Sequence, residues 1–456
     1  MSRAFRAAAR GASLLTYYFD LAWRSCRRSK ALTALVVLLM GCGAATCMVS
    51  FAVFRAAAAD PIPWKSQQLF VPQIDNFGPA HNWKGEPPIL LSYTDAQALL
   101  HARQAKRQVL IYGIRGTVLP DDARQQPLPQ EGDAVSSDFF AMFDARFRYG
   151  GGWSAHDDEQ RAAVVVISSA LNQKLFGGAD SVGREINLDA HAYRIVGVLD
   201  DWEPRPRYFD MVSTFYAFGH PRQLYLPFSR AIDVQKATSG QFYCSTNTVD
   251  PDLPNWDSML HSECAWIAAW VELPTHADVG RYRDWLRNYA AEQQRLGRFG
   301  WAPNVRLSDV MQWLRQDSFN VVPKSSALAL VVSVSFLLIC LVNVIGLMLA
   351  RFMRRAPEIG VRRALGASRG AICRQFLTEA AAIGLAGGVL GLLLTALGMA
   401  GIGKVFEPEI AKLARLDASL LLLTVLVAVA TSVIAALYPT WRAAQVQPAW
   451  QLKVNG

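Results

Sequence analysis

Four long stretches of this sequence contain no aspartate, glutamate, lysine, arginine or histidine, namely residues 31–54, 325–350, 380–403 and 418–441. A helix rises about 1.5 Å per residue, so about 20 apolar residues cross the roughly 30 Å of hydrocarbon in a bilayer. We therefore predict a membrane protein with transmembrane helices at 31–55, 325–350, 380–403 and 418–441. A large α+β domain, residues 56–324, is expected between the first span and the other three.

The spans also lack the ionisable residues that usually mark ion and proton pathways. Asn343 is the one strongly polar residue within them, and an amide at such a position is typical of hydrogen bonding between helices. The sequence therefore disfavours a proton-coupled carrier.

A phosphate-binding loop is also missing. The nearest string, GADSVGRE at 178–185, lacks the lysine and the hydroxyl that such a loop places on phosphate and magnesium. His261 and Cys264 are spaced as one pair of zinc ligands, but no second pair completes a site. We therefore expect no metal, no cofactor and no catalytic residue in this chain, which excludes an ATPase of this type.

Cysteine is scarce in the inserted region. Of the seven cysteines, only Cys244 and Cys264 lie within 56–324. In an oxidising compartment they can form a disulfide or stay as two thiols, and we favour the disulfide because free thiols are hazardous there.

Basic residues gather beside the spans. Residues 1–30 hold seven arginines and lysines before the first span, and 351–379 hold seven arginines. The positive-inside rule places both segments, and the tail at 442–456, in the cytoplasm, whereas the balanced loop at 404–417 lies outside. The LMGC string at 39–42 resembles a lipoprotein cleavage box. An uncleaved anchor is favoured because apolar sequence continues to Phe54.

The inserted region mixes strand and helix patterns. Strands are predicted at 109–114, 164–167 and 192–199, and helices from Thr94 onward and at 278–298. Between 203 and 270 aromatic residues are frequent. They indicate either a bulky aromatic core, which we favour, or a surface for a partner or amphipathic substrate.

Glycines in the third span form two overlapping G-x-x-x-G patterns, Gly384 with Gly388 and Gly387 with Gly391. This spacing lets helix backbones approach closely, so we predict helix packing or dimerisation at these residues.

Three separated stretches resemble one family, the permeases of the MacB and FtsX type in bacterial ABC transport systems. They are AVVVISSALNQKLFGGADSVGREINLDAHAYRIVGVLDDW at 163–202, LARFMRRAPEIGVRRALGASRGAICRQFLTEAA at 349–381, and LYPTWRAAQVQPAWQLK at 437–453. The resemblance implies a periplasmic core domain, an intracellular loop and the family's C-terminal ending. It is weakest over 203–270.

The resemblance also implies partners. MacB carries its own ATPase domain and this sequence has none, so we expect a separate ABC ATPase that binds ATP and magnesium, and a second permease copy or paralogue. The intracellular loop, 351–379, is expected to couple to that ATPase through Glu358, Ile359, Gly360, Arg362, Arg363, Gly366 and Arg369. Glu358 and Arg362 are spaced to pair on a helix that Gly366 ends. The alternative is that these arginines hold anionic lipid headgroups.

The expected location is the bacterial inner membrane, with both termini in the cytoplasm. The favoured function is MacB-like export through a periplasmic adaptor and an outer-membrane channel. FtsX-like regulation of an envelope hydrolase and Lol-like lipoprotein extraction are the alternatives.

Overall fold

A computed structural model describes residues 29–82, 84–119, 126–202, 204–210, 221–244, 255–316, 324–401 and 417–444. The chain divides into two compact units. We call the residues up to Ala58 and from Lys324 onward the helical unit, and the residues from Ala59 to Gln316 the inserted unit.

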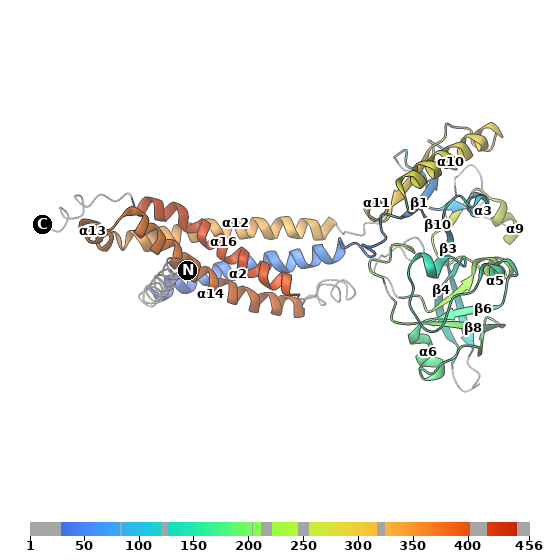
Figure 1. Cartoon of the computed structure of the whole chain (residues 1–456), viewed down its shortest axis with the longest axis horizontal. Coiled ribbons are helices and arrows are strands. Elements are labelled where there is room, and N and C mark those ends of the chain that lie inside the picture. The colour runs from blue at the N-terminus through green and yellow to red at the C-terminus, as the bar shows by residue number, and fades with distance from the viewer. Residues whose placement is uncertain are drawn as a thin grey trace, which may run out of the picture. The chain divides into compact units, whose positions relative to one another are not determined.

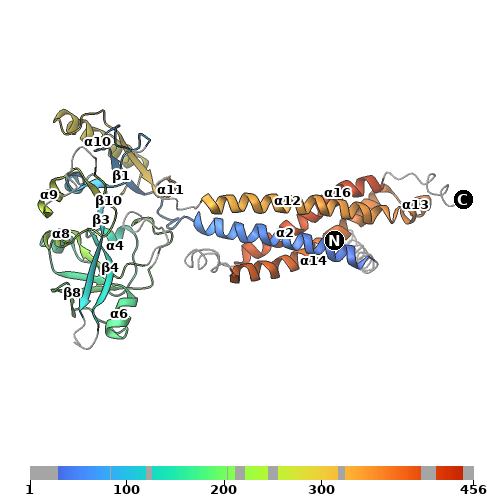
Figure 2. The same cartoon turned by 180° about the vertical axis from the view of Figure 1, so that it is seen from behind.

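Long apolar helices make up the helical unit (Figures 1 and 2). Its described helices are α2 (Lys30–Ala57), α12 (Lys324–Met353), α13 (Ala356–Ala364), α14 (Arg369–Gly401) and α16 (Ala418–Ala444). Four of them, all except α13, are long and apolar enough to cross a membrane, which confirms the predicted one-plus-three arrangement of spans. Helix α14 begins at Arg369, before the predicted start at residue 380, because the polar residues that precede the apolar stretch continue the same helix.

Helix α14 packs along both α2 and α16 in the helical unit. Its buried face includes Ile383, Gly384, Gly387, Gly388 and Gly391. Toward the α13 end of the unit, a buried cluster joins Val36 and Met40 of α2 to residues of α12, α13, α14 and α16. The spans therefore form one packed bundle with α13 attached to it.

One mixed sheet organises the inserted unit. Its strands are β1 (Leu69–Ile74), β2 (Leu91–Ser92), β3 (Arg107–Leu119), β4 (Leu128–Val135), β5 (Phe147–Gly150), β6 (Val164–Ile167), β7 (Glu185–Leu188), β8 (His191–Leu199), β9 (Leu224–Pro227), β10 (Ala265–Glu272) and β11 (Val305–Asp309). The order is β11-β1-β10-β3-β4-β9-β6-β8-β5, with β2 beside β10 and β7 beside β3 and β8. Pairs β4–β9 and β6–β8 are parallel and the other pairs are antiparallel.

Helices connect and cover these strands. They are α3 (Tyr93–Ala102), α4 (Phe139–Met142), α5 (Ala155–Glu159), α6 (Ser169–Phe176), α8 (Phe228–Asp233), α9 (Trp256–His261), α10 (His276–Arg295) and α11 (Val310–Leu314). The helix predicted from Thr94 onward begins one residue earlier, at Tyr93, because the hydroxyl of the N-cap residue Ser92 accepts a hydrogen bond from the Asp95 N–H. Helix α10 begins with a capping box formed by Thr275 and Asp278.

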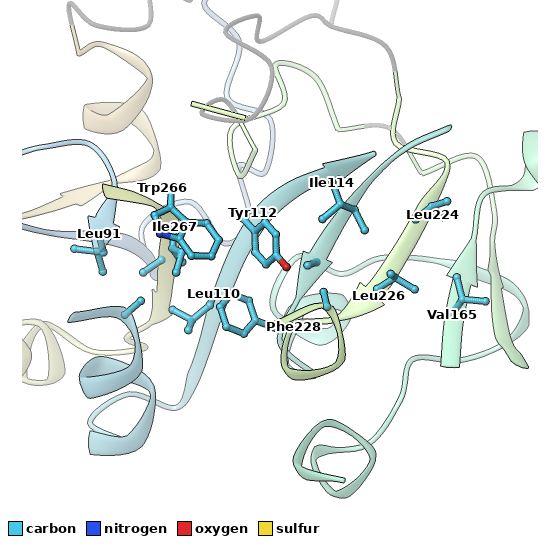
Figure 3. Packing of buried hydrophobic residues seen from close by; sticks show 14 of the residues in the cluster. Leu91, Leu110, Tyr112, Ile114, Val165, Leu224, Leu226, Phe228, Trp266 and Ile267 are labelled. Carbon is cyan, nitrogen blue, oxygen red and sulfur yellow. The ribbon is translucent and has the colours of Figure 1, made fainter. Parts of the chain in front are cut away.

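The main core of the inserted unit is rich in aromatic rings. Figure 3 shows Tyr112 of β3 close to Trp266 of β10 and Phe228 of α8, and its ring lies edge-on to both, at centroid distances of 4.9 and 5.5 Å. Six described aromatics from the 203–270 stretch are at most 3% exposed, namely Tyr208, Phe209, Tyr225, Phe228, Trp266 and Trp270. The interpretation of that stretch as core is therefore confirmed for these residues, whereas residues 211–220 lie outside the described ones.

Candidate coupling surface between two spans

Helix α13 joins the end of α12 to the start of α14. The chain leaves α12 at Met353 and re-enters a helix at Ala356, with Pro357 in its first turn, where a missing N–H costs nothing. Glu358 lies in the first turn and Arg362 and Arg363 in the last, as the helix dipole favours. The helix ends before Gly366, whose φ of +96° favours glycine, as predicted.

The inner face of α13 is apolar. Ile359 is 4% exposed and belongs to the buried cluster that includes Phe352 of α12 and Phe376 of α14, whose rings lie 4.2 Å apart. Gly360 is also buried. Ile359 and Gly360 therefore anchor α13 to the spans and cannot touch a docking partner, which differs from the expectation that they lie on the contact surface.

A buried ion cluster holds the same region together. The Glu379 carboxylate of α14 lies 2.5 Å from Arg351 and 3.1 Å from Arg355. Arg351 also donates a hydrogen bond of 3.0 Å to the Thr33 hydroxyl of α2. The side chains of Arg351 and Glu379 are only 3% and 2% exposed. Because unpaired charges at such depth are costly, this cluster fixes α2, α12 and α14 relative to one another.

Sequence reasoning did not identify the Arg351–Glu379 pair. Both residues lie beside the predicted spans, in a segment where charges are ordinarily solvated. One signal was available, since Glu379 is one of only two acidic residues among the many arginines of 351–379.

The outer face of α13 combines positive charge with apolar side chains. Arg362 pairs with Glu358 at 2.8 Å, four residues earlier, and its guanidinium donates to Gln375 of α14 at 3.0 Å. Val361 is 56% exposed and Leu365 is 83% exposed. Sequence reasoning missed these two, although their i,i+4 spacing in a polar helix marks one face. Exposed apolar groups beside arginines are typical of a protein-binding surface.

Arg363 and Arg369 complete the set of predicted contact residues. Arg363 is partly exposed at the end of α13, and Arg369 is exposed at the first residue of α14. All four charged residues of the predicted set, Glu358, Arg362, Arg363 and Arg369, are therefore at least partly exposed, three on α13 and Arg369 at the start of α14.

The four glycines of α14 contact two neighbouring helices of the same chain. A Cβ added at Gly384 would lie 2.9 Å from the Val429 Cα of α16, and one added at Gly387 would lie 3.0 Å from the Met40 Cβ of α2. Gly388 also faces α16, and Gly391 faces α2 and α16. These glycines therefore serve packing within the chain.

Cys244 and Cys264 form a disulfide in the inserted unit. The next residue, Ala265, exchanges backbone hydrogen bonds with Tyr243. Glu263 pairs with Arg298 at 2.7 Å, and Arg298 also reaches Asp95 of α3 at 2.6 Å. The bridge thus lies beside a partly buried ion network that connects the chain after α10 to α3.

The inserted unit has a second buried ion cluster, which is rich in carboxylates. Nε of Arg222 lies 2.9 Å from both Asp133 of β4 and Asp210, and Nη1 lies 3.0 Å from Glu131. Asp133 and Asp210 are fully buried. Burial, together with the nearby Asp210 carboxylate, raises the pKa of Asp133 to about 8.

Two protein-family models match this chain. Residues 32–288 match the family described as MacB-like periplasmic core domain, and residues 330–448 match the one described as FtsX-like permease C-terminal. The first match covers the first span and most of the inserted region, and the second covers the three C-terminal spans.

Individual relatives are distant in sequence. YvrN of Bacillus subtilis, an ABC transporter permease, is 26% identical over 318 residues, which cover 69% of this chain and 68% of YvrN. The macrolide export ATP-binding/permease protein MacB of Salmonella typhi is 25% identical over 58% of this chain and 34% of its own length. The pyoverdine export ATP-binding/permease protein PvdT of Pseudomonas savastanoi pv. phaseolicola is 28% identical over 57% of this chain and 34% of its own. The matched region thus spans about a third of these two export proteins.

Two solved structures align with this chain at TM-scores below 0.5. The periplasmic region of MacB from Actinobacillus actinomycetemcomitans aligns with a TM-score of 0.34 and 12% identity, covering 55% of this chain and 92% of that one. The extracellular domain of the transporter YknZ from Gram-positive bacteria aligns with a TM-score of 0.32 and 12% identity, covering 53% and 100%.

Proposed function

The chain belongs to the MacB-like permeases of ABC transporters, since the core-domain match covers more than half of it, and from this premise we propose that it couples a separate ATPase to its inserted domain. It is a multi-pass inner-membrane permease with an FtsX-like C-terminal region. In the proposed mechanism, ATP-driven movement of a cytoplasmic ATPase displaces α13, and the spans carry that displacement to the inserted unit. The ATPase binds ATP and magnesium, and this chain supplies no catalytic residue.

The observation that carries the proposal is the two-sided construction of α13. Its inner face is fixed to the spans by Ile359, and the turn before it is fixed by the pair between Arg355 and Glu379. Its outer face offers Val361 and Leu365 beside arginines. A helix attached in this way moves together with α12 and α14, which is what a transmitting element requires.

Export is the process we propose for the coupled motion. The relatives MacB and PvdT are named as export proteins for macrolides and pyoverdine. By analogy the substrate leaves through a periplasmic adaptor and an outer-membrane channel, while two permease chains serve one ATPase dimer. Those names favour export over regulation of an envelope hydrolase and over lipoprotein extraction.

The test is co-purification of the full chain with its cognate ABC ATPase. Arg362→Glu combined with Arg363→Glu reverses the charge of the outer face and should lower ATPase recovery at least tenfold, because loss of central interface contacts commonly costs about 2 kcal/mol. Leu365→Ser tests the apolar part without touching an ion pair. Arg283→Glu with Arg287→Glu, an equal charge change on exposed residues of α10, is the matched control.

Normal ATPase recovery with both α13 variants, in correctly inserted protein of normal abundance, would reject the coupling role. Loss of the ATPase with the α10 control as well would point to a general effect of charge. Native mass spectrometry of the complex tests the stoichiometry, and a stable complex with a single permease would contradict the paired arrangement.

A further inference from the structure

A cavity of about 380 Å³ lies where two spans end, beside the start of α13. Its lining residues are Ser29, Leu32, Arg351, Arg354, Arg355, Pro357 and Glu358. Ser29 and Leu32 belong to the start of α2, and Arg351 lies in the last turn of α12. Because α2 and α12 are candidate spans, the cavity opens at the level of the membrane surface.

Three arginines give this cavity its charge. Arg351 and Arg355 are both held by Glu379, so two guanidinium groups have fixed positions. The Arg354 side chain is exposed and makes no ion pair or hydrogen bond with the rest of the described chain. Glu358, the acidic residue of the lining, is paired with Arg362. Planar guanidinium groups match the oxygens of a phosphate, so the cavity has the chemistry to bind a phosphate-bearing anion.

An apolar strip of α2 leads away from the cavity. Leu35 and Leu38 follow Leu32 at three-residue intervals along the helix and are 44% and 52% exposed. Residues three apart lie on neighbouring positions of one helix side. A ligand whose phosphate is in the cavity can therefore lay a hydrocarbon chain along α2 within the membrane.

We propose that this cavity binds the phosphate group of an anionic membrane phospholipid. The phosphate contacts Arg354 and the pre-positioned Arg351 and Arg355, and one acyl chain lies along Leu35 and Leu38. The site does not depend on the coupling function, because its ligand comes from the membrane and its arginines, Arg351, Arg354 and Arg355, differ from those of the outer face of α13.

Native mass spectrometry of the full chain in micelles with equal phosphatidylglycerol and phosphatidylcholine tests the proposal. The wild-type chain should retain phosphatidylglycerol preferentially. Arg354→Gln should reduce that preference about fivefold, since one arginine near an anionic surface contributes about 1 kcal/mol. Arg369→Gln, the same change at an exposed arginine outside the cavity, should leave the preference unchanged.

Two further measurements distinguish binding of a lipid from binding of a soluble anion. Leu35→Asn should weaken phosphatidylglycerol retention, and inorganic phosphate should fail to displace the lipid. Equal retention of both lipids by the wild type, an equal loss with Arg369→Gln, or displacement by inorganic phosphate would overturn the proposal.

The proposed coupling function and the proposed lipid site can be rejected independently of each other. Arg354→Gln should keep the ATPase in co-purification while losing the lipid preference. Leu365→Ser should lose the ATPase and keep that preference, because Leu365 does not line the cavity.

Discussion

The two units each bury an ion cluster, and the clusters have opposite composition. In the helical unit, one carboxylate, Glu379, is shared by Arg351 and Arg355. In the inserted unit, Asp133, Asp210 and Glu131 share the guanidinium of Arg222, and Asp210 also lies 3.5 Å from the buried Arg207, so carboxylates outnumber guanidinium groups. Each cluster bridges elements that are distant in sequence.

One cluster has an excess of carboxylates and the other an excess of guanidinium groups. This difference in charge decides whether a cluster attracts a proton or an anion. Burial and the neighbouring Asp210 carboxylate both favour the protonated form of Asp133, and they raise its pKa to about 8. Arginine cannot release its proton near neutral pH, so an arginine-rich cluster favours an anion, which is the basis of the phosphate site proposed above. Buried ion clusters of opposite composition can therefore serve different purposes, one as a proton site and the other as a phosphate site.

The largest effect is expected from breaking the carboxylate-rich cluster. Arg222→Met removes the guanidinium that pairs with the buried Asp133, and removal of one member of a buried pair costs about 3–5 kcal/mol. Urea unfolding of the full chain in micelles, followed by tryptophan fluorescence, should show this loss for the inserted unit. Arg115→Met removes only an exposed pair with Glu131, so its effect should stay below about 1 kcal/mol. Equal effects of the two variants would contradict the assignment of Arg222 as the centre of the cluster.

A somewhat smaller effect is expected from the arginine-rich cluster. Glu379→Gln removes the carboxylate that the buried Arg351 shares with the partly buried Arg355. The helical unit should therefore lose about 3 kcal/mol of stability. Thermal unfolding in micelles measures the loss, with Glu358→Gln as the control for an exposed pair. Anionic lipid should restore part of the stability of Glu379→Gln and none of that of Arg222→Met. Equal rescue of both variants would contradict the claim that only the arginine-rich cluster attracts an anion.

The smallest effect concerns pH. Asp133 holds its proton in the folded protein up to about pH 8, whereas an unfolded aspartate releases it near pH 4. Its contribution to stability is therefore fully present below about pH 4 and is lost as pH rises toward 8, at most about 1.4 kcal/mol per pH unit.

Asp133→Asn removes this titration. Urea midpoints of both proteins at about pH 5 and 7 measure it, and the wild type should weaken more than the variant over that interval. Equal changes in the two proteins would show that Asp133 does not carry a displaced proton.

Local patterns made much of the architecture predictable. The charge-free stretches marked four spans, and the apolar run VVVI at 164–167 coincides with β6. The two cysteines that stand alone in the inserted region are joined in the structure. Each of these signals lies within one short segment of sequence. These features could therefore be predicted without knowing which distant segments pack together.

Contacts between distant segments were not predictable. Asp133 meets Arg222 because β4 and β9 pair in parallel, and no local pattern announces that pairing. The inward orientation of Ile359 depends on where α12 and α14 place Phe352 and Phe376. The cytoplasmic location of α13 and its contact with an ATPase stay predictions.

Helix α14 runs without interruption through 33 residues, from Arg369 to Gly401. At about 1.5 Å per residue it is about 50 Å long, well beyond the roughly 30 Å of hydrocarbon that a bilayer offers. If a helix of that length tilts as a rigid rod by about 10° about one end, its other end moves by about 9 Å. Small rotations at the segment that carries Arg369 are thereby converted into displacements as large as the spacing between packed helices.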